Sequence, residues 1–361
     1  MVETMSYAEK IQAAAIIFPV IAALFTFIYI IREYHKYGAL HFFKAVIIYS
    51  FIFYMLCAYF LIIMPLPTRS EAAAMTTPYI QLKLFYFMTP GYDKTETFYN
   101  CLLLIPLGFY LHYYFRKSFF PALCIIFATT LFFELTQLSG LYGIYPRPYR
   151  VFDVNDLMTN TAGGIIGWCA APLFSFLPSR TRMDEVASEH GKTVSAARRF
   201  LGFALDLAVI SVFYIIMKRL HLNLKSPQFA AALGVRLSDV LSNYMFLFCI
   251  YFIALPFISN GRTIGKILVN IRVVKCGTHP GNRTACLLRN LIHFGSVFLM
   301  PYLTWYFVGD SFACNVIAGI CGILFIISVM LIIHESIHGK PKFYERLSGT
   351  TEISGTAADD E

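Results

Sequence analysis

Apolar residues in this sequence come in long blocks, and they do not recur as the stripe that marks one face of a soluble helix. Each block holds about 20 residues, which is enough for a helix to cross a hydrocarbon core about 30 Å thick. The blocks lie at residues 11–31, 43–64, 97–115, 119–138, 157–177, 200–217, 240–259, 292–308 and 312–334. The pattern predicts an all-α integral membrane protein, a polytopic helical bundle with about nine transmembrane helices.

The composition and the placement of basic residues agree with this class. Hydrophobic residues make up 58% of the chain and charged residues 14%, whereas about 25% of a typical soluble domain is charged. Cytoplasmic loops are enriched in Lys and Arg, and an outside N-terminus with a cytoplasmic C-terminus places 19 of the 29 such residues inside. We therefore expect the basic residues behind the net charge of +8 to contact acidic lipids at the membrane surface. We expect no nucleic-acid partner.

A polar stretch at 178–197 divides the spans into five and four. We predict a first membrane domain at 1–177, a cytoplasmic linker at 178–197 and a second membrane domain at 198–352. An acidic tail, 353–361, is predicted to be disordered. The sequence does not indicate an oligomeric state.

Polar side chains gather at the outer ends of two spans in the first domain. Glu134 and Gln137 are three residues apart and share a helical face at the end of span 119–138. On span 157–177, the residues Asp156, Asn160, Gly163 and Gly167 share a face. Small residues four apart let a second helix approach closely, and we expect span 119–138 to be that partner.

If the two spans pack together along Gly163 and Gly167, Glu134 and Gln137 would meet Asp156 and Asn160. Arg150 would then be their counter-charge. Polar groups at membrane depth are costly and often functional, which favours an outward-facing site. The alternative is purely structural, with Asp153 as a helix cap and the other groups as contacts between helices. The predicted outward polar cluster is Glu134, Gln137, Arg150, Asp153, Asp156 and Asn160, with Gly163 and Gly167 as helix-packing residues.

Three stretches of the first domain resemble successive motifs of the VanZ-like family. They are "NCLLLIPLGFYL" from Asn100, "FELTQ" around Glu134, and "RVFDVNDLMTNTAGGIIG" from Arg150. The resemblance covers about residues 45–177. It implies a protein of the bacterial cytoplasmic membrane and, from the prototype of the family, lowered susceptibility to the glycopeptide teicoplanin.

The second domain carries a different set of motifs, which is similar to the RDD family over about residues 195–352. Arg199 and Asp206 are seven apart on one helical face, and they are followed by a Gly-x-Thr-x-Gly-Lys motif, by Arg289 and by "YERLSGT". The matching residues are Arg199, Asp206, Gly261, Thr263, Gly265, Lys266, Arg289 and Glu345. The resemblance implies transport, with ion or proton antiport as one form, although Arg199 and Asp206 could also form a structural ion pair.

The stretch "HESIH" ends the last predicted span. Its two imidazoles, His334 and His338, lie one helical turn apart with Glu335 between them, the arrangement of a zinc site whose carboxylate acts as a base. Gly339 and Pro341 end the helix at once, and only distant residues such as Glu345 offer a third ligand.

We therefore expect a non-enzymatic envelope protein whose outward cluster binds a cell-wall precursor or a lipid headgroup and modulates glycopeptide susceptibility. No cofactor is required by this hypothesis, and membrane lipids are the expected partners. One alternative is an ion- or proton-coupled transporter that uses Asp206 and Glu134 as proton-linked carboxylates. The other is an intramembrane zinc hydrolase built on His334, Glu335 and His338.

Overall fold

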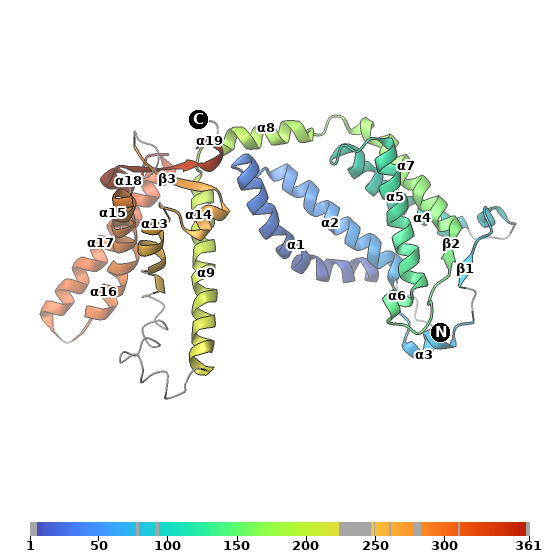
Figure 1. Ribbon diagram of the computed structural model, residues 1–361, viewed down its shortest axis with the longest axis horizontal. Helices are drawn as coiled ribbons and strands as arrows, with labels where there is room; N and C mark the ends of the chain where they lie inside the picture. Colours follow the sequence, from blue (N-terminus) through green and yellow to red (C-terminus); the bar gives the residue numbers. More distant parts are fainter. Residues whose placement is uncertain are drawn as a thin grey trace. The chain divides into compact units, whose positions relative to one another are not determined.

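The computed structural model is predominantly helical (Figure 1). It describes residues 6–76, 79–90, 94–223, 247–248, 250–259, 261–276, 283–309 and 311–358. The chain divides into two compact units. The first comprises Met1–Ile28 and His41–Val186, and the second comprises Tyr29–Leu40 and Ala187–Glu361. Each unit is described by itself.

Apolar helices make up most of the first unit. They are α1 (Tyr7–Tyr37, whose last residues belong to the second unit), α2 (Phe42–Ile63), α4 (Lys94–Tyr113), α5 (Phe119–Leu138) and α7 (Val154–Ala170). Shorter elements are α3 (Arg69–Ala74), η1 (Tyr86–Met88), α6 (Gly140–Gly143), η2 (Ala171–Phe174) and α8 (Arg180–Gly191, whose last residues belong to the second unit). Strands β1 (Ile80–Gln81) and β2 (Phe152–Asp153) pair in parallel and join the segment after α3 to the start of α7.

Glycines bring α4 and α7 into backbone contact, and the two helices run side by side (Figure 1). A Cβ atom on Gly163 would lie 1.8 Å from the carbonyl oxygen of Cys101, and one on Gly167 would lie 1.9 Å from that of Ile105. A Cβ on Gly108 of α4 would in turn lie 1.8 Å from the carbonyl oxygen of Gly164. Only glycine fits at such distances, so the seam fixes how far the two helices are apart.

The predicted partner of this seam is therefore wrong. Gly163 and Gly167 face α4, whereas we expected them to face the helix that became α5. The neighbouring Gly164 faces α5, where a Cβ atom would lie 2.4 Å from the side chain of Ile126. Adjacent glycines thus allow α7 to contact two helices at once, and a buried core that includes Leu104, Leu107 and Ile126 fills the space among α2, α4 and α5.

The second unit combines helices with one short antiparallel sheet. Its helical elements are α9 (Ala196–Asn223), η3 (Ile250–Ala254), α13 (Leu255–Ile258), α14 (Ile264–Leu268), α15 (Arg283–Phe294), η4 (Gly295–Leu299), α16 (Met300–Phe307), α17 (Phe312–Ile337), α18 (Phe343–Ser348) and α19 (Gly355–Ala358). Strands β3 (Ile271–Lys275) and β4 (Thr350–Ser354) pair with Val273 opposite Glu352. Because side chains alternate along a strand, Thr350, Glu352 and Ser354 all point to the buried face of this sheet.

Within the described part of the chain, six helices are long and apolar enough to cross a membrane. They are Tyr7–Tyr37, Phe42–Ile63, Phe119–Leu138, Ala196–Ile216, Arg283–Trp305 and Phe312–Ile337. The predicted spans 97–115 and 157–177 correspond to α4, which carries Lys94, Glu96 and Asn100, and to α7, which has 17 residues and is followed by η2. Part of the predicted span 240–259 lies outside the described residues. A polytopic helical membrane protein is therefore confirmed, while nine spans and the orientation of the termini stay predictions.

Two segments are more ordered than the sequence suggested. The polar stretch 178–197 contains α8, and Lys44 of α2 forms an ion pair of 2.8 Å with Asp184 of that helix. The tail from residue 353 was predicted to be disordered, which is wrong for 353–358, because these residues complete β4 and form α19. Hydrogen bonding explains this order, since the amide of Gly355 donates to the carbonyl oxygen of Asn270 at 2.9 Å. Residues 359–361 of the tail lie outside the described residues.

We expect Gly163→Ala to lower the melting temperature of the purified protein in detergent. The added methyl group would overlap the backbone of Cys101, and overpacking of this kind costs on the order of 1–3 kcal/mol. Gly319 of α17 is the matched control, because a Cβ there meets nothing within 4 Å. Gly319→Ala should leave the melting temperature unchanged or raise it, since Ala favours helix over Gly by about 1 kcal/mol. Equal effects of the two substitutions on the melting temperature would contradict the close packing of α4 against α7 at Gly163.

Candidate functional site

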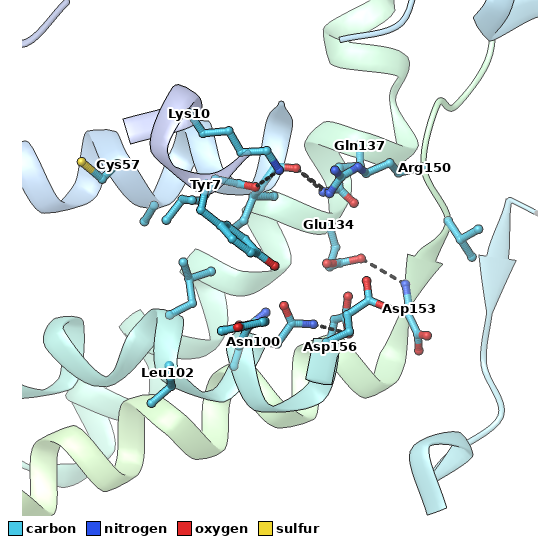
Figure 2. A pocket seen from close by; sticks show the side chains of 18 of the residues that line it. Tyr7, Lys10, Cys57, Asn100, Leu102, Glu134, Gln137, Arg150, Asp153 and Asp156 are labelled. Atoms are coloured by element: carbon cyan, nitrogen blue, oxygen red, sulfur yellow. Dashed lines mark hydrogen bonds between the residues drawn. The ribbon is translucent and has the colours of Figure 1, made fainter. Parts of the chain in front are cut away.

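A cavity of about 1220 Å³ lies in the first unit, where five helices meet at one end (Figure 2). The first turns of α1, α4 and α7 and the last turns of α2 and α5 contribute to its lining, together with residues 75–86. This arrangement agrees with helices that cross the unit in alternating directions, because every second helix then begins where its neighbours end. The cavity is therefore formed mainly by helix ends, where backbone groups lack partners within the helix.

Two carboxylates face the same part of this cavity, those of Glu134 and Asp156 (Figure 2). The side chain of Glu134 is buried, and its Oε2 accepts a hydrogen bond of 3.0 Å from the backbone amide of Asp153. The Oδ1 of Asp156 accepts one of 2.6 Å from the side-chain amide of Asn100. Among the residues that the structure describes, no cationic side chain forms an ion pair with either carboxylate.

Two cations lie on the other side of the cavity, at the carboxyl end of α2 (Figure 2). Arg150 donates from Nη1 to the carbonyl oxygen of Ile62 at 2.8 Å and from Nη2 to that of Met64 at 3.0 Å. The ammonium group of Lys10 lies 3.4 Å from the carbonyl oxygen of Leu61. The last carbonyl groups of a helix are unpaired and carry partial negative charge, which explains why both cations are held there.

Arg150, which we expected as the counter-charge of the acidic residues, forms no ion pair with them among the described residues, although its charge still acts on Glu134 and Asp156 through space. Its guanidinium group is held by two carbonyl oxygens, and a side chain from α5, Gln137, donates to one of them, that of Ile62, at 3.1 Å. Backbone acceptors at the end of α2 thus hold Arg150 in place of the carboxylates. The consequence is a cavity with separated charges, cationic at α2 and anionic at the start of α7.

Hydrogen bonds also fix the start of α7. The side chain of Asp153 accepts from the amide of Asn155 at 2.7 Å and caps the helix. Asn155 in turn holds the segment before α4, because it donates to the carbonyl oxygen of Lys83 and accepts from the amide of Tyr86. One turn further on, Asn160 donates to the hydroxyl of Thr130 in α5 at 3.2 Å. The Oδ1 atom of Asn160 is buried and receives no hydrogen bond from the described residues.

The cavity brings together every member of the predicted outward cluster: Glu134, Gln137, Arg150, Asp153, Asp156 and Asn160. The predicted pairing within the cluster differs, because Asp156 meets Asn100 and Asn160 meets Thr130. Sequence reasoning missed Asn100, although it stands in one of the quoted motifs. It also missed Lys10, a single basic residue at the start of the first apolar block, whose position beside α2 could not be read from the sequence.

The second unit holds Asp206, the carboxylate that we had considered as a proton carrier. Its Oδ1 accepts from the amide of Gly265 and from the hydroxyl of Tyr251, and its Oδ2 accepts from the hydroxyl of Thr263, each at 2.6 Å. Gly265 has to be glycine because a Cβ atom would lie 1.9 Å from the carbonyl oxygen of Gly202. The carboxylate thus fastens the Gly-x-Thr-x-Gly turn to α9, which is a structural role.

Arg199 does not pair with Asp206, so the ion pair that the sequence suggested is not formed. The guanidinium group of Arg199 instead contacts Glu345 at 2.9 Å and Glu352 at 3.1 Å. Lys266 and Arg289 also reach Glu352, at 3.1 and 2.7 Å. These five residues, which we call the C-terminal charge network, join α9, α14 and α15 to α18 and β4. Gly261, the remaining member of the motif, adopts a positive φ of 83° in the turn before α14.

Electrostatics in this network favour the ionised form of Glu352. Burial alone would raise the pKa of its carboxyl, but Arg289, Lys266 and Arg199 outweigh that effect and hold the pKa well below its ordinary value of 4.5. Burial lowers the pKa of Lys266, and the charge of Glu352 opposes this shift. The network therefore acts as a set of mutually dependent charges on the buried face of the β3–β4 sheet.

Glu335, which we had considered as the base of a zinc hydrolase, is occupied by two other partners. Its Oε1 pairs with Arg346 at 2.7 Å and its Oε2 accepts from the amide of Phe343 at 2.7 Å, so it anchors α18. His338 bonds through Nδ1 to the carbonyl oxygen of His334 at 2.8 Å, and their rings lie 4.2 Å apart. Among the described residues, no third His, Cys, Asp or Glu joins these two imidazoles in a metal-binding group. This geometry does not favour the zinc hydrolase.

Comparison with protein families agrees with the two units. The family model described as VanZ/LLP1 matches residues 51–175, and the model of the RDD family matches residues 193–339. The chain therefore carries a VanZ-like domain followed by an RDD domain, in the order that the sequence motifs predicted. Comparison with curated proteins and with solved structures gave no match.

We predict that Glu352→Gln flattens the acid side of the thermal stability profile. A carboxyl whose pKa is lowered by folding stabilises the folded state above its unfolded pKa of about 4.5, and this contribution is lost as the pH falls below that value. The melting temperature of the unaltered protein should thus drop between about pH 5 and pH 3, and Glu352→Gln should weaken the dependence. Glu185→Gln, at an exposed position of α8, should keep the original slope. Identical slopes for all three proteins would exclude this role of Glu352.

Proposed function

Because the chain joins a VanZ-like domain to an RDD domain in a helical membrane protein, we propose that it is a ligand-binding envelope protein of the bacterial cytoplasmic membrane. Its cavity in the first unit would bind a cell-wall precursor or a lipid headgroup on the outer side. The observation that carries this proposal is the separation of charge within one cavity. Glu134 and Asp156 form no ion pair with a cationic side chain among the described residues. Arg150 and Lys10 donate to carbonyl groups at the end of α2, and the ammonium group of Lys10 also lies 5.6 Å from the ring centre of Tyr7.

A cavity with these properties suits a polar ligand that supplies the missing partners. Buried charges without partners are unfavourable, and a ligand that pairs with them gains the strength of hydrogen bonds to ionised groups. The carboxylates receive their hydrogen bonds from a backbone amide and an asparagine, which position them without neutralising their charge.

Reduced susceptibility to glycopeptides of the teicoplanin type is the biological role we propose for this binding. The role rests on the resemblance to the VanZ-like family and on the chemistry of the cavity. That chemistry suits polar molecules at the outer face of the cytoplasmic membrane. Glycopeptides act at that surface, so a protein that binds a cell-wall precursor or a lipid headgroup there can alter their access. The RDD domain would act as the membrane partner of the VanZ-like domain in the same chain.

The outward orientation predicts the labelling of single cysteines in a background without the nine native cysteines. Ile144→Cys, at an exposed site after α6, should react with a membrane-impermeant maleimide added to intact cells. Glu189→Cys, at an exposed position of α8, should react only after the membrane is opened. The reverse pattern would place the cavity on the cytoplasmic side and would refute the proposed function.

Expression of the protein should raise the teicoplanin concentration that inhibits a susceptible host, and Glu134→Gln should remove the increase. This substitution keeps the size of the side chain but removes the charge that faces the cavity. Glu185→Gln makes the same chemical change outside the cavity and should retain the effect. Membrane levels of each variant, measured by immunoblot, separate loss of function from loss of protein. An unchanged phenotype in Glu134→Gln at equal protein level would contradict a role of the cavity.

A further inference from the structure

Three oxygen atoms around the acidic side of the cavity receive no hydrogen bond from the described residues. Glu134 uses Oε2 for the amide of Asp153, which leaves Oε1 without a donor. Asp156 uses Oδ1 for Asn100, which leaves Oδ2. The third is Oδ1 of Asn160, whose side chain is only 3% exposed and lines the same cavity. Oδ1 of Asn160 is the fully buried atom of the three, and buried acceptors without donors are rare in proteins and call for an explanation.

We infer that the ligand of this cavity carries a primary ammonium group, which donates hydrogen bonds to Glu134, Asp156 and Asn160. The inference rests on the proposed function, because it names the chemical class of the ligand for the same cavity. A primary ammonium group has three N–H donors, one for each free oxygen, and its charge neutralises the carboxylates. The aromatic ring of Tyr99, which also lines the cavity, adds a surface that attracts cations.

Other cations fit this set of acceptors less well. A quaternary ammonium group such as that of choline has no N–H and would leave all three oxygens without a donor. Mg²⁺ and Ca²⁺ prefer six or more oxygen ligands, and no group of three His, Cys, Asp or Glu suited to a metal is found in the described part of the chain. The uncharged amide oxygen of Asn160 lacks a hydrogen-bond donor, and an N–H group of the ligand would supply one.

The cationic side of the cavity indicates that the ligand also carries an anionic group. Lys10 uses one of its three N–H donors, for the carbonyl oxygen of Leu61, and Arg150 has no hydrogen bond from Nε within the described residues. Both side chains line the cavity, and Figure 2 shows Glu134 between Arg150 and Asp156. A zwitterion with an ammonium group and a phosphate or carboxylate group would therefore match the two sides. An aminophospholipid headgroup and a peptide with a free amino group share this chemistry.

The test measures protection of Cys57, a native cysteine that lines the cavity. A variant that keeps Cys57 and lacks the other eight cysteines is purified in an uncharged detergent, and the rate of maleimide labelling is followed. The probes are dihexanoyl lipids with ethanolamine, choline or glycerol headgroups, the peptide lysyl-D-alanyl-D-alanine, and Mg²⁺ or Ca²⁺ alone. We expect the ethanolamine lipid, the peptide or both to slow labelling, and protection by only one of them identifies the source of the ligand.

Substitutions assign the protection to the three oxygens. Glu134→Gln and Asp156→Asn should each weaken the affinity of the protecting probe by roughly tenfold or more, since each removes a charged hydrogen-bond partner. Glu185→Gln should leave the affinity unchanged. The melting temperature without probe shows whether each variant is folded. If one of Glu134→Gln and Asp156→Asn does not fold, the affinity of the other variant still tests the inference.

The remaining outcomes separate this inference from the proposed function. Equal protection by choline, glycerol and ethanolamine lipids overturns the ammonium but retains a binding cavity. Protection by Mg²⁺ or Ca²⁺ alone makes the cavity a metal site and overturns the inference. Absence of protection by every probe also overturns it, and the proposed function then stands or falls with the labelling of Ile144→Cys and the phenotype of Glu134→Gln.

Discussion

The first unit depends on the close contact between the backbones of α4 and α7. Glycines at 108, 163 and 167 allow the contact, since any side chain at these positions would overlap a carbonyl group of the opposite helix. The contact also aligns the first turns of the two helices, which places Asn100 within 2.6 Å of Asp156. In a membrane, where water supplies little competition and apolar side chains gain little from contact with each other, such packing decides which helices associate. The acidic side of the cavity is a direct consequence.

Several charged side chains that line the cavity are held by backbone groups and not by one another. The amide of Asp153 binds Glu134, and the carbonyl groups at the end of α2 bind Arg150 and Lys10. Helix ends provide these partners because the first amides and the last carbonyls of a helix have none inside it. Each charge is thereby positioned without being neutralised. A ligand can then meet charges of both signs in one cavity, which direct ion pairs would have prevented.

The sequence predicted which residues gather in the cavity but not how they pair. The helical period and the spacing of the residues along the sequence place four of them on one helical face: Asp156, Asn160, Gly163 and Gly167. This face does meet another helix through its glycines. Nothing in the spacing distinguishes α4 from α5 as the partner, since both neighbour α7 and both carry polar residues near the correct end. The partners of Arg150 could not be predicted either, because they are carbonyl groups, which every residue has. Likewise, the tail after residue 352 reads as polar and acidic, and only its pairing with β3 gives it structure.

The cavity of the first unit and the C-terminal charge network of the second treat charged side chains in opposite ways, and this difference is why we propose the ligand site in the cavity. In the second unit, Asp206 accepts three hydrogen bonds and the carboxylates of Glu345 and Glu352 contact cationic side chains directly. Those groups hold the turn before α14, the strand β4 and helix α18 in place, and a ligand would have to displace existing partners to reach them. The carboxylates of the first unit keep free oxygens that face a cavity. Binding there requires no bond within the protein to be broken, so the first unit is where a polar ligand gains most.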